Sequence, residues 1–404
     1  MLIPSIDLMG GRAVQLRRGR ERIVTSDKDP IALAEELNAY GTPAVIDLDA
    51  AMGTGNNTEL QKSICRRTGA RAGGGIRTEQ KARELLRAGA ERIILGTALW
   101  EDFAKDLPRR KIQAALDTNN NRVMTHGWRK EREEPFEEQL KRAEERAGSV
   151  LCTFIENEGT MQGMSRERVE QLKERTNLPI TVAGGISGTK NATDILRTGV
   201  DLQVGMALYT NKLDPIEAIA AQIPEENPTP TIVQDETGQV RMLAYSTRES
   251  LKRALTAKKG IYYSRSRKEL WEKGSTSGNT QRLISCRLDC DMDAILFTVK
   301  QKGSACHTGS HSCFAQESFS LQTLHNIIES RRDQPGSYTN RLLNSRQFLN
   351  EKLLEEAREL TEAATVDEAI WEAADLLYFL SVTIQEKGIT LRDVLSELEG
   401  RRKE

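Results

Sequence analysis

Two stretches of the chain decide the fold, AGGGIRTEQKARELLRAGAERIILGTAL (72–99) and AGGISGTKNATDILRTGVDLQVGMAL (183–208), because they repeat one pattern. Each begins with a short run that ends in consecutive glycines, continues with apolar residues at helical spacing, and ends in a β-type run before another glycine. Self-similarity of this length is the signature of an internal repeat. The repeat predicts a fold built from two similar halves.

Residues 1–224 alternate β-type runs with helical patterns, which indicates βα units around a parallel sheet. Eight such runs occur: LIPSI, AVIDL, ARAGG, RIILG, IQAAL, VLCTFI, ITVAGG and DLQVG. Asp7 and Asp117, each closing an apolar run, are 110 residues apart, and Gly74 and Gly185 are 111 apart. The shared offset and the number of runs predict a closed (β/α)8 barrel of two halves.

The remainder of the chain divides into three segments. Residues 225–231 are polar and Pro-rich and are expected to form a linker. Residues 232–317 mix four β-type runs with one helical stretch and Gly-containing turns, which predicts a small β-rich α+β domain. Residues 318–404 carry apolar residues at helical spacing and are expected to form an all-α helical bundle. A bundle this short favours a second copy of the chain that completes its core.

Composition excludes several classes of protein. Of the 404 residues, 58 are Lys or Arg and 59 are Asp or Glu, so the net charge of -1 gives no bias toward nucleic acid or a membrane surface. The first apolar stretch contains Asp7 and lacks a basic region, which is typical of a strand rather than of a secretory signal. Four of the six cysteines lie between Cys286 and Cys313, which favours a metal site in a reducing cytoplasm over disulfides.

The barrel predicts an active site at the carboxyl ends of its strands. Asp7 and Asp117 end opposite strands of the two halves, so they could act as general base and general acid. Glycines after four strands would leave backbone N–H groups free to bind a phosphate in each half: Gly74, Gly75, Gly96, Gly184, Gly185 and Gly205. The alternative is that these glycines only form tight turns and that the aspartates cap helices.

The cysteine cluster predicts a zinc site. The three candidate ligands are Cys290, Cys306 and Cys313. Three protein ligands and an open fourth position describe a catalytic zinc, which lowers the pKa of a bound water toward ~7. His307 lies beside one ligand and could relay protons. The alternative is a structural zinc with Cys286 or His311 as its fourth ligand.

Two further features surround these cysteines. Asp289, Asp291 and Asp293 alternate in DCDMD, so in an extended segment their carboxylates would share one face and bind Mg²⁺. The stretch 262–279 mixes basic and aromatic residues that could bind a phosphate and stack on a purine: Arg265, Arg267, Trp271 and Lys273. The alternatives for this stretch are a basic hairpin and a nucleic-acid patch.

Two acidic helical patterns predict a second Mg²⁺ site. One turn of LLEEARE carries Glu355, Glu356 and Glu359, and EAAD places Glu372 and Asp375 three residues apart. Like charges at this spacing repel one another unless a cation neutralises them. Mg²⁺ with a diphosphate substrate would do so, with Glu356 and Glu359 also as catalytic candidates. The alternative is a solvated helix surface.

The barrel motifs IPSIDLMGGRAVQL, VIDLDAAMGTGN, GGGIR, GTAL, ALD, GW, EGT and AGGI resemble phosphoribosylformimino-AICAR-phosphate isomerase over about 220 residues. The resemblance implies a cofactor-free Amadori rearrangement of an aminoaldose to an aminoketose. It makes Asp7 the base and Asp117 the acid, stacks Trp128 on the substrate, and adds Thr160 to the substrate-binding residues.

The later segments resemble two further enzymes. IVQDETGQVRMLAY, YYSRSRKELWEKGSTSGN, DCDMDAI and ACHTGSHSCF are similar to phosphoribosyl-AMP cyclohydrolase over residues 230–315. This implies zinc-dependent opening of the adenine ring, Mg²⁺ near the aspartates, and a homodimer whose zinc cysteines come from two subunits. GSYTNRLL, KLLEEARE and EAADLLYFL are similar to phosphoribosyl-ATP pyrophosphohydrolase over residues 319–404, an all-α relative of the MazG-type nucleotide pyrophosphatases.

Three hypotheses follow. The first is a trifunctional enzyme acting on phosphoribosyl nucleotides, with Zn²⁺ and Mg²⁺. The second is a bifunctional cyclohydrolase and pyrophosphohydrolase whose barrel is only a scaffold. The third, a zinc-dependent nucleic-acid-binding protein, is disfavoured by composition. Several positions depart from the residues usual in the resembled families: Gln15 replaces a common Arg, Glu158 an Asp and Phe379 a His. Ser246 and Thr247 stand in place of Met-Asn, and the first loop reads RGRERIVTSDKDP.

Overall fold

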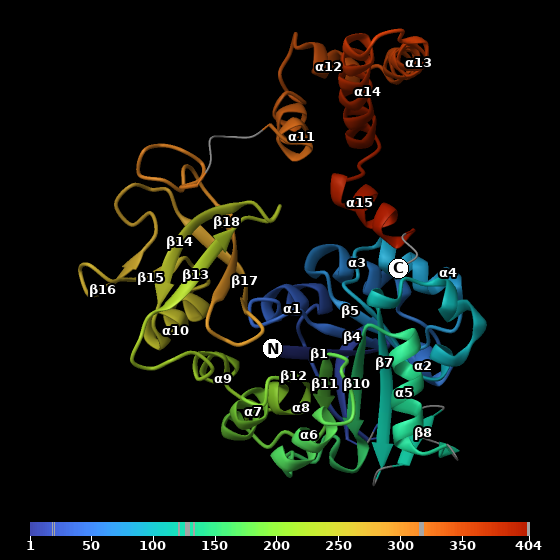
Figure 1. Cartoon of the computed structure of the whole chain (residues 1–404), viewed down its shortest axis with the longest axis vertical. Coiled ribbons are helices and arrows are strands. Elements are labelled where there is room, and N and C mark those ends of the chain that lie inside the picture. The colour runs from blue at the N-terminus through green and yellow to red at the C-terminus, as the bar shows by residue number, and fades with distance from the viewer. Residues whose placement is uncertain are drawn as a thin grey trace. The chain divides into compact units, whose positions relative to one another are not determined.

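The computed structural model describes residues 1–17, 19, 21–119, 122–125, 130–131, 134–314 and 319–401. The described residues form two compact units, one of residues up to 314 and the other of residues 319–399 (Figure 1). Within the described ranges, none of the helices combines the length and the apolarity needed to cross a membrane.

Eight parallel strands of the first unit close into a barrel. They are β1 (Leu2–Met9), β4 (Ala44–Asp47), β5 (Arg71–Gly73), β6 (Ile93–Leu95), β7 (Ile112–Asn119), β10 (Ser149–Phe154), β11 (Ile180–Ala183) and β12 (Asp201–Val204). The ring is continuous because β1 pairs with both β12 and β4, and β7 pairs with both β6 and β10. Every strand lies at one of the eight predicted runs, so the predicted barrel is confirmed.

Helices and turns connect these strands. The longer helices are α1 (Pro30–Leu37), α3 (Thr58–Thr68), α4 (Glu79–Arg87), α5 (Phe136–Arg146), α6 (Arg166–Lys173), α7 (Thr189–Leu196) and α9 (Pro215–Ala220). The shorter elements are β2 (Arg12–Arg17), β3 (Glu21–Thr25), α2 (Leu48–Met52), η1 (Thr97–Trp100), η2 (Asp102–Asp106), η3 (Arg109–Lys111), β8 (Arg122–Thr125), β9 (Lys130–Glu131), η4 (Ile155–Asn157) and α8 (Met206–Tyr209). Helix α1 begins where the Asp29 carboxylate accepts hydrogen bonds from the Ile31 and Ala32 N–H groups, and Pro30 suits its first turn.

Buried side chains fill the middle of the barrel, and a polar cluster lies at the amino ends of the strands. Small and branched side chains form the central layer: Ile3, Ala44, Ile94, Leu151 and Ala183. At the amino ends, the buried Arg71 guanidinium donates hydrogen bonds to Thr181 Oγ1 (3.1 Å) and Asp201 Oδ2 (3.0 Å). A ligand therefore has room at the opposite end, which is the usual position of a barrel's active site.

A small β-rich α+β domain follows within the same unit. It contains β13 (Thr229–Gln234), β14 (Val240–Ser246), α10 (Arg248–Ala257), β15 (Ile261–Ser264), β16 (Glu269–Glu272), β17 (Gln281–Leu288) and β18 (Ile295–Gln301). Four strands form a sheet in the order β14-β13-β18-β17, and β15 pairs with β16. Strand β13 begins at Thr229, inside the segment 225–231 that was expected to be a linker. Pro230 is tolerated in this strand because β13 pairs with β18 only from Thr231 onward.

The barrel and this domain share one hydrophobic core and several polar contacts. The Cys286 N–H donates to the Ala39 carbonyl oxygen (3.2 Å), and Lys252 forms an ion pair with Glu217 (2.7 Å). The apolar contact explains why residues 1–314 form one compact unit.

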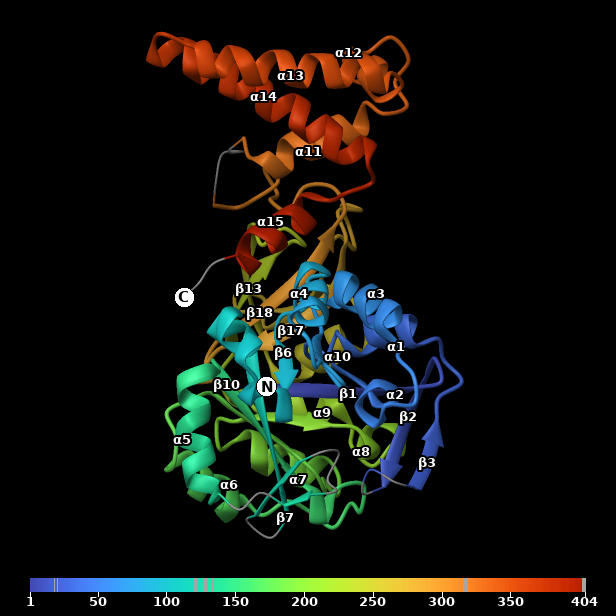
Figure 2. The ribbon, with the colours of Figure 1, turned by 90° about the vertical axis from the view of Figure 1, so that its right-hand side faces the viewer.

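The second unit is helical, as the sequence predicts. Its helices are α11 (Leu321–Ser330), α12 (Tyr338–Leu343), α13 (Arg346–Glu362), α14 (Val366–Glu386) and α15 (Leu391–Gly400). Figure 2 shows α13 and α14 lying along one another, and they make the largest helix contact of the unit. The buried core is small: Ile328, Leu342, Leu349, Phe379 and Val382. Phe379 contributes to this core and makes an edge contact with the Tyr338 ring, so an apolar residue suits its position.

Candidate active sites

A cavity of about 1010 Å³ lies at the carboxyl ends of the barrel strands. Asp7 on β1 and Asp117 on β7 both line it, as predicted from their strand-end positions. The six predicted glycines also line it: Gly74, Gly75, Gly96, Gly184, Gly185 and Gly205. The structure therefore brings the predicted acid-base pair and both glycine groups into one cavity.

The carboxyl groups of this cavity lie in an environment that disfavours their charge. Burial raises the pKa of Asp7 to about 7, against the opposing effect of a hydrogen bond from the Ser5 hydroxyl. Burial, followed by the charges of Asp7 and Asp117, raises the pKa of Glu158 to about 8. Near neutral pH Glu158 is thus mostly protonated, while Asp7 exchanges its proton readily.

Two of the glycines are required by the backbone. Gly74 has φ +89° and Gly184 has φ +103°, a region that side-chain-bearing residues rarely adopt. A Cβ atom would lie 2.3 Å from the Asp47 carbonyl oxygen at Gly74 and 2.6 Å from the Phe154 carbonyl oxygen at Gly184. The tight turns therefore need glycine, and the same turns leave the backbone open to a ligand.

Gln15 occupies the space beside one predicted phosphate-binding glycine. Its side chain is 2% exposed and lines the cavity, and a Cβ added to Gly205 would lie 2.1 Å from Gln15 Oε1. Its Nε2 atom is buried without a hydrogen-bond partner among the described residues. A neutral amide donor thus stands next to Gly205, at the position where the resembled family commonly has Arg.

One predicted barrel residue, Thr160, stands apart from this cavity, and three polar residues that were not predicted line it. The Thr160 hydroxyl donates to the Asn157 carbonyl oxygen (2.7 Å) and Thr160 does not line the cavity. Trp128 lies outside the described residues. Ser5, Thr153 and Gln203 line the cavity, and the alternation of side chains along a strand was the only signal for them.

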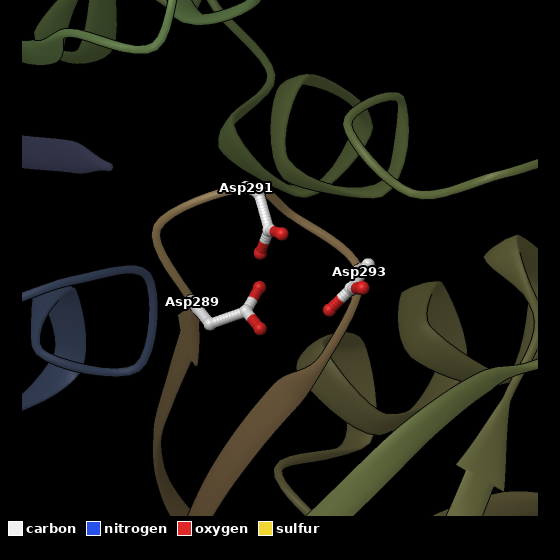
Figure 3. A group of neighbouring side chains, drawn as sticks. All are labelled: Asp289, Asp291 and Asp293. Carbon is white, nitrogen blue, oxygen red and sulfur yellow. The ribbon is translucent and has the colours of Figure 1, made fainter.

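The three aspartates of DCDMD converge in the loop between β17 and β18. Figure 3 shows the carboxylates of Asp289, Asp291 and Asp293 pointing toward a common centre, and their ligand oxygens lie within 4.8 Å of one another. The sequence analysis expected an extended segment here, and that expectation is wrong. It is a turn in which the Asp289 N–H donates to the Ala294 carbonyl oxygen (3.1 Å) and Met292 has φ +66°. The pKa of Asp293 is raised by its hydrogen bond with Asp289 and by the charges of Asp291 and Asp289.

One chain brings together two of the three predicted zinc cysteines. The thiols of Cys306 and Cys313 hydrogen-bond to each other, and the Thr308 hydroxyl donates to Cys306 Sγ (3.1 Å), which lowers the pKa of Cys306. Cys290 lies in the aspartate loop and does not join them: in the described ranges, the groups of three or more candidate ligands within 4.8 Å contain no cysteine. His307 Nδ1 lies 3.8 Å from Cys306 Sγ.

The predicted basic residues spread over the β15–β16 hairpin and the turn after it. The exposed Arg265 guanidinium stacks on the Tyr245 ring (3.6 Å), and Arg267 forms an ion pair with Glu269 (3.1 Å). Trp271 is partly buried against the Tyr262 ring, so it serves the core as well as the surface. Burial and the neighbouring Cys306 raise the pKa of Cys313, and the charge of Lys273 opposes this rise, so this lysine lies near the cysteine pair.

The acidic helices of the second unit form a compact carboxylate group. Ligand oxygens of Glu356, Glu359 and Glu372 lie within 4.8 Å of one another. The pKa of Glu356 is raised by burial, then by the charges of Asp375 and Glu359, so Asp375 also faces this group. Glu355 is not one of these three carboxylates; it forms an ion pair with Lys352 (2.8 Å), whose Nζ also lies 4.0 Å from Glu356 Oε1.

Comparison with known proteins identifies the three parts. Residues 1–214 match the family model described as histidine biosynthesis protein, residues 242–315 that of phosphoribosyl-AMP cyclohydrolase, and residues 321–402 that of phosphoribosyl-ATP pyrophosphohydrolase. This order confirms the predicted one.

Two kinds of curated relative are similar to the chain. The histidine biosynthesis bifunctional protein HisIE of Caldanaerobacter subterraneus is 44% identical over 195 residues, 44% of this chain and 95% of the relative. That of Bacillus subtilis is 42% identical over 196 residues, 45% of this chain and 94% of the relative. The histidine biosynthesis trifunctional protein of Kluyveromyces lactis is 45% identical over 168 residues, 41% of this chain. The match spans only 21% of that relative's length. The chain therefore belongs to the histidine biosynthesis protein family and carries, in order, a barrel of that family, a phosphoribosyl-AMP cyclohydrolase domain and a phosphoribosyl-ATP pyrophosphohydrolase domain.

Proposed function

We propose that the chain is a trifunctional enzyme of histidine biosynthesis. It hydrolyses phosphoribosyl-ATP to phosphoribosyl-AMP and pyrophosphate, opens the adenine ring of phosphoribosyl-AMP, and isomerises the resulting aminoaldose to the aminoketose. The observation that carries the third activity is the cavity in which Asp7, Asp117 and both glycine groups meet. The first two activities are supported by the two carboxylate groups, the cysteine pair and the family matches.

The barrel's own residues suit an Amadori rearrangement. The sugar ring opens when its ring oxygen gains a proton. The carbon beside the amine-bearing carbon then loses a proton to give an enaminol, which becomes the aminoketose when its hydroxyl loses a proton and the amine-bearing carbon gains one. Asp117 is the proton donor and Asp7 the proton acceptor, because a carboxyl with a pKa of about 7 takes up and releases protons near neutral pH. The glycine turns of the two halves hold the two phosphate ends of the substrate.

The carboxylate groups fit Mg²⁺ and the cysteines fit Zn²⁺. Oxygen ligands within 4.8 Å of one another suit a hard cation, and thiols in contact suit a soft one. When bound, zinc supplies an activated water, and Mg²⁺ neutralises the charge of the diphosphate. His307, beside Cys306, is placed to relay a proton.

A homodimer completes the zinc site. Because Cys290 does not reach Cys306 and Cys313 within one chain, the third thiolate would come from a second copy. Apolar side chains left exposed on two surfaces support such an assembly: Ile232 and Leu243 on the sheet, and Leu354, Ile370 and Trp371 on the helices. None of the three proposed zinc cysteines is in a disulfide, which supports a location in the reducing cytoplasm.

The scaffold hypothesis for the barrel has one supporting observation. The barrel shares a core with the cyclohydrolase domain, so it would stabilise that domain even if it catalysed no reaction of its own.

An assay of the purified full-length chain with the aminoaldose separates the two hypotheses. The variant Asp7→Asn and the exposed control Asp102→Asn are assayed beside the wild type. Trifunctionality predicts turnover by the wild type and the control and none by Asp7→Asn. No turnover by the wild type, with ring opening intact, would establish the scaffold instead.

A further inference from the structure

Two polar residues stand beside Asp7 where the barrel closes. Strand β1 pairs with β12, and in this register Ile3 lies opposite Gln203. Ser5 and Asp7 alternate along β1, so their side chains leave the strand on the same side. Ser5, Asp7 and Gln203 all line the cavity.

A directed chain of hydrogen bonds links these three side chains. Gln203 Nε2 donates to Ser5 Oγ (3.4 Å), and the Ser5 hydroxyl donates to Asp7 Oδ1 (3.2 Å). An amide N–H only donates, so Ser5 Oγ is the acceptor of the first bond and its own proton is free for Asp7. Donors aligned in this way strengthen one another in a low-dielectric interior.

We propose that Ser5 and Gln203 form a positioning pair that orients the Asp7 carboxylate and favours its proton-accepting, ionised form. The pair deepens the proposed isomerase activity and rests on it for its kinetic consequence. Neither residue needs to touch the reacting atoms. Ser5 acts on Asp7, and Gln203 acts on Ser5 by holding its hydroxyl in one orientation.

The surroundings of Asp7 explain why such a pair is needed. Asp7 acts electrostatically on Glu158 after η4 and on the Tyr209 phenol on α8, and Asp117 on β7 also acts on Glu158. The Arg77 guanidinium lines the cavity too, but it donates to the Ala50 and Ala51 carbonyl oxygens (2.9 Å each). Burial raises the pKa of Asp7, and among the described residues the Ser5 hydroxyl is the group that lowers it. Without Ser5, less of Asp7 would be ionised at neutral pH.

Full-length variants test the pair through the pH dependence of isomerisation. Ser5→Ala removes the hydrogen bond to a charged group, so the acid limb of kcat/KM should move up by about one pH unit, a tenfold loss on that limb. Gln203→Leu should move it by less in the same direction. The double variant should match Ser5→Ala alone, because Gln203 acts only through Ser5. Ser5→Thr, which keeps the hydroxyl, should restore the profile.

The matched control is Ser149→Ala. Ser149 is also buried on a barrel strand, and its hydroxyl has no hydrogen-bond partner in the described part of the chain. The same Ser→Ala change there should leave the pH profile unchanged. The positioning role of Ser5 and Gln203 would be refuted if Ser149→Ala shifted the pH profile as much as Ser5→Ala does. It would also be refuted if the shifts of Ser5→Ala and Gln203→Leu added up in the double variant.

A second readout does not depend on turnover. Carbon-13 labelling of the aspartate carboxyls in the full-length chain gives the titration of Asp7, identified by its absence in Asp7→Asn. The pair predicts an upward shift of this titration in Ser5→Ala. If Ser5→Ala shifts the titration of Asp7 but the wild-type chain does not isomerise the aminoaldose, the proposed activity is refuted and the positioning role of Ser5 and Gln203 stands. An active chain in which Ser5→Ala leaves both the titration and the profile unchanged would refute the pair.

Discussion

Replacing Glu356 by Gln should stabilise the second unit in the absence of Mg²⁺ and abolish its response to Mg²⁺. Glu356 is 7% exposed and lies with Glu359 and Glu372 in a group whose oxygens are within 4.8 Å of one another. Its pKa is raised, so burial and neighbouring charge already oppose its ionisation. The variant removes one of three mutually repelling charges and keeps the shape of the side chain.

The magnitude follows from Coulomb's law. Two unit charges separated by 4.8 Å repel by about 3.5 kcal/mol at an effective dielectric constant of about 20. Glu359 and Glu372 are partly exposed and Lys352 Nζ lies 4.0 Å from Glu356 Oε1, so solvent, salt and this cation reduce the net gain to about 1–2 kcal/mol. This corresponds to a change of roughly 5–30-fold in the equilibrium between the closed and opened helices.

Hydrogen exchange in α13 and α14 of the full-length chain measures this change. Without Mg²⁺, protection should be higher in Glu356→Gln than in the wild type. Mg²⁺ should protect only the wild type, and pyrophosphate release should fall at least about tenfold in the variant. Since the folded-state pKa of Glu356 is raised, the Mg²⁺-free wild type should also become more stable as the pH falls toward that pKa, and the variant should lose this dependence.

Glu355→Gln is the control, because Glu355 is adjacent on α13 but is not one of the three clustered carboxylates, and the variant keeps Lys352, which lies 4.0 Å from Glu356 Oε1. It should keep the Mg²⁺ response and pyrophosphate release. A Glu356→Gln variant that gains protection from Mg²⁺ as the wild type does would refute the metal assignment.

Three further predictions concern the other sites. Because the pKa of Asp7 is about 7, kcat/KM for isomerisation should fall about tenfold for each pH unit below that value, and a profile flat to pH 5 would exclude Asp7 as the base. Gly184→Ala should cost about 1–3 kcal/mol of stability or raise KM for the aminoaldose, since its Cβ would meet the Phe154 carbonyl oxygen at 2.6 Å; calorimetry and initial rates measure both. Cys290→Ser and Cys306→Ser should each lack ring opening, and subunit exchange between them should restore part of it if zinc is shared between copies.

The barrel and its cavity could be predicted because they depend on local patterns. Each β-type run becomes a strand, and parallel strands bring their carboxyl ends to one face. Asp7 and Asp117 therefore meet although they are far apart in the sequence. The glycine turns after β5 and β11 follow the same rule, since their positive φ angles and close backbone contacts require glycine.

Other features depend on tertiary structure that no local pattern encodes. The Ser5–Gln203 contact exists only because β12 closes the barrel against β1. The three DCDMD carboxylates lie together as predicted. They do so because the backbone turns, and not because the side chains alternate along an extended strand. On α13, the local EExxE pattern does not distinguish Glu355 from Glu356, because the packing of α14 decides which carboxylate faces Glu372.

The central claim is that one chain carries three successive activities. The most direct test incubates the purified full-length chain with phosphoribosyl-ATP, Zn²⁺ and Mg²⁺ and follows all products by mass spectrometry with chromatographic separation of the isomers. We expect phosphoribosyl-AMP with pyrophosphate, then the ring-opened aminoaldose, then the aminoketose, with the last step absent in Asp7→Asn. Accumulation of the aminoaldose as the final product of the wild-type chain would contradict the claim.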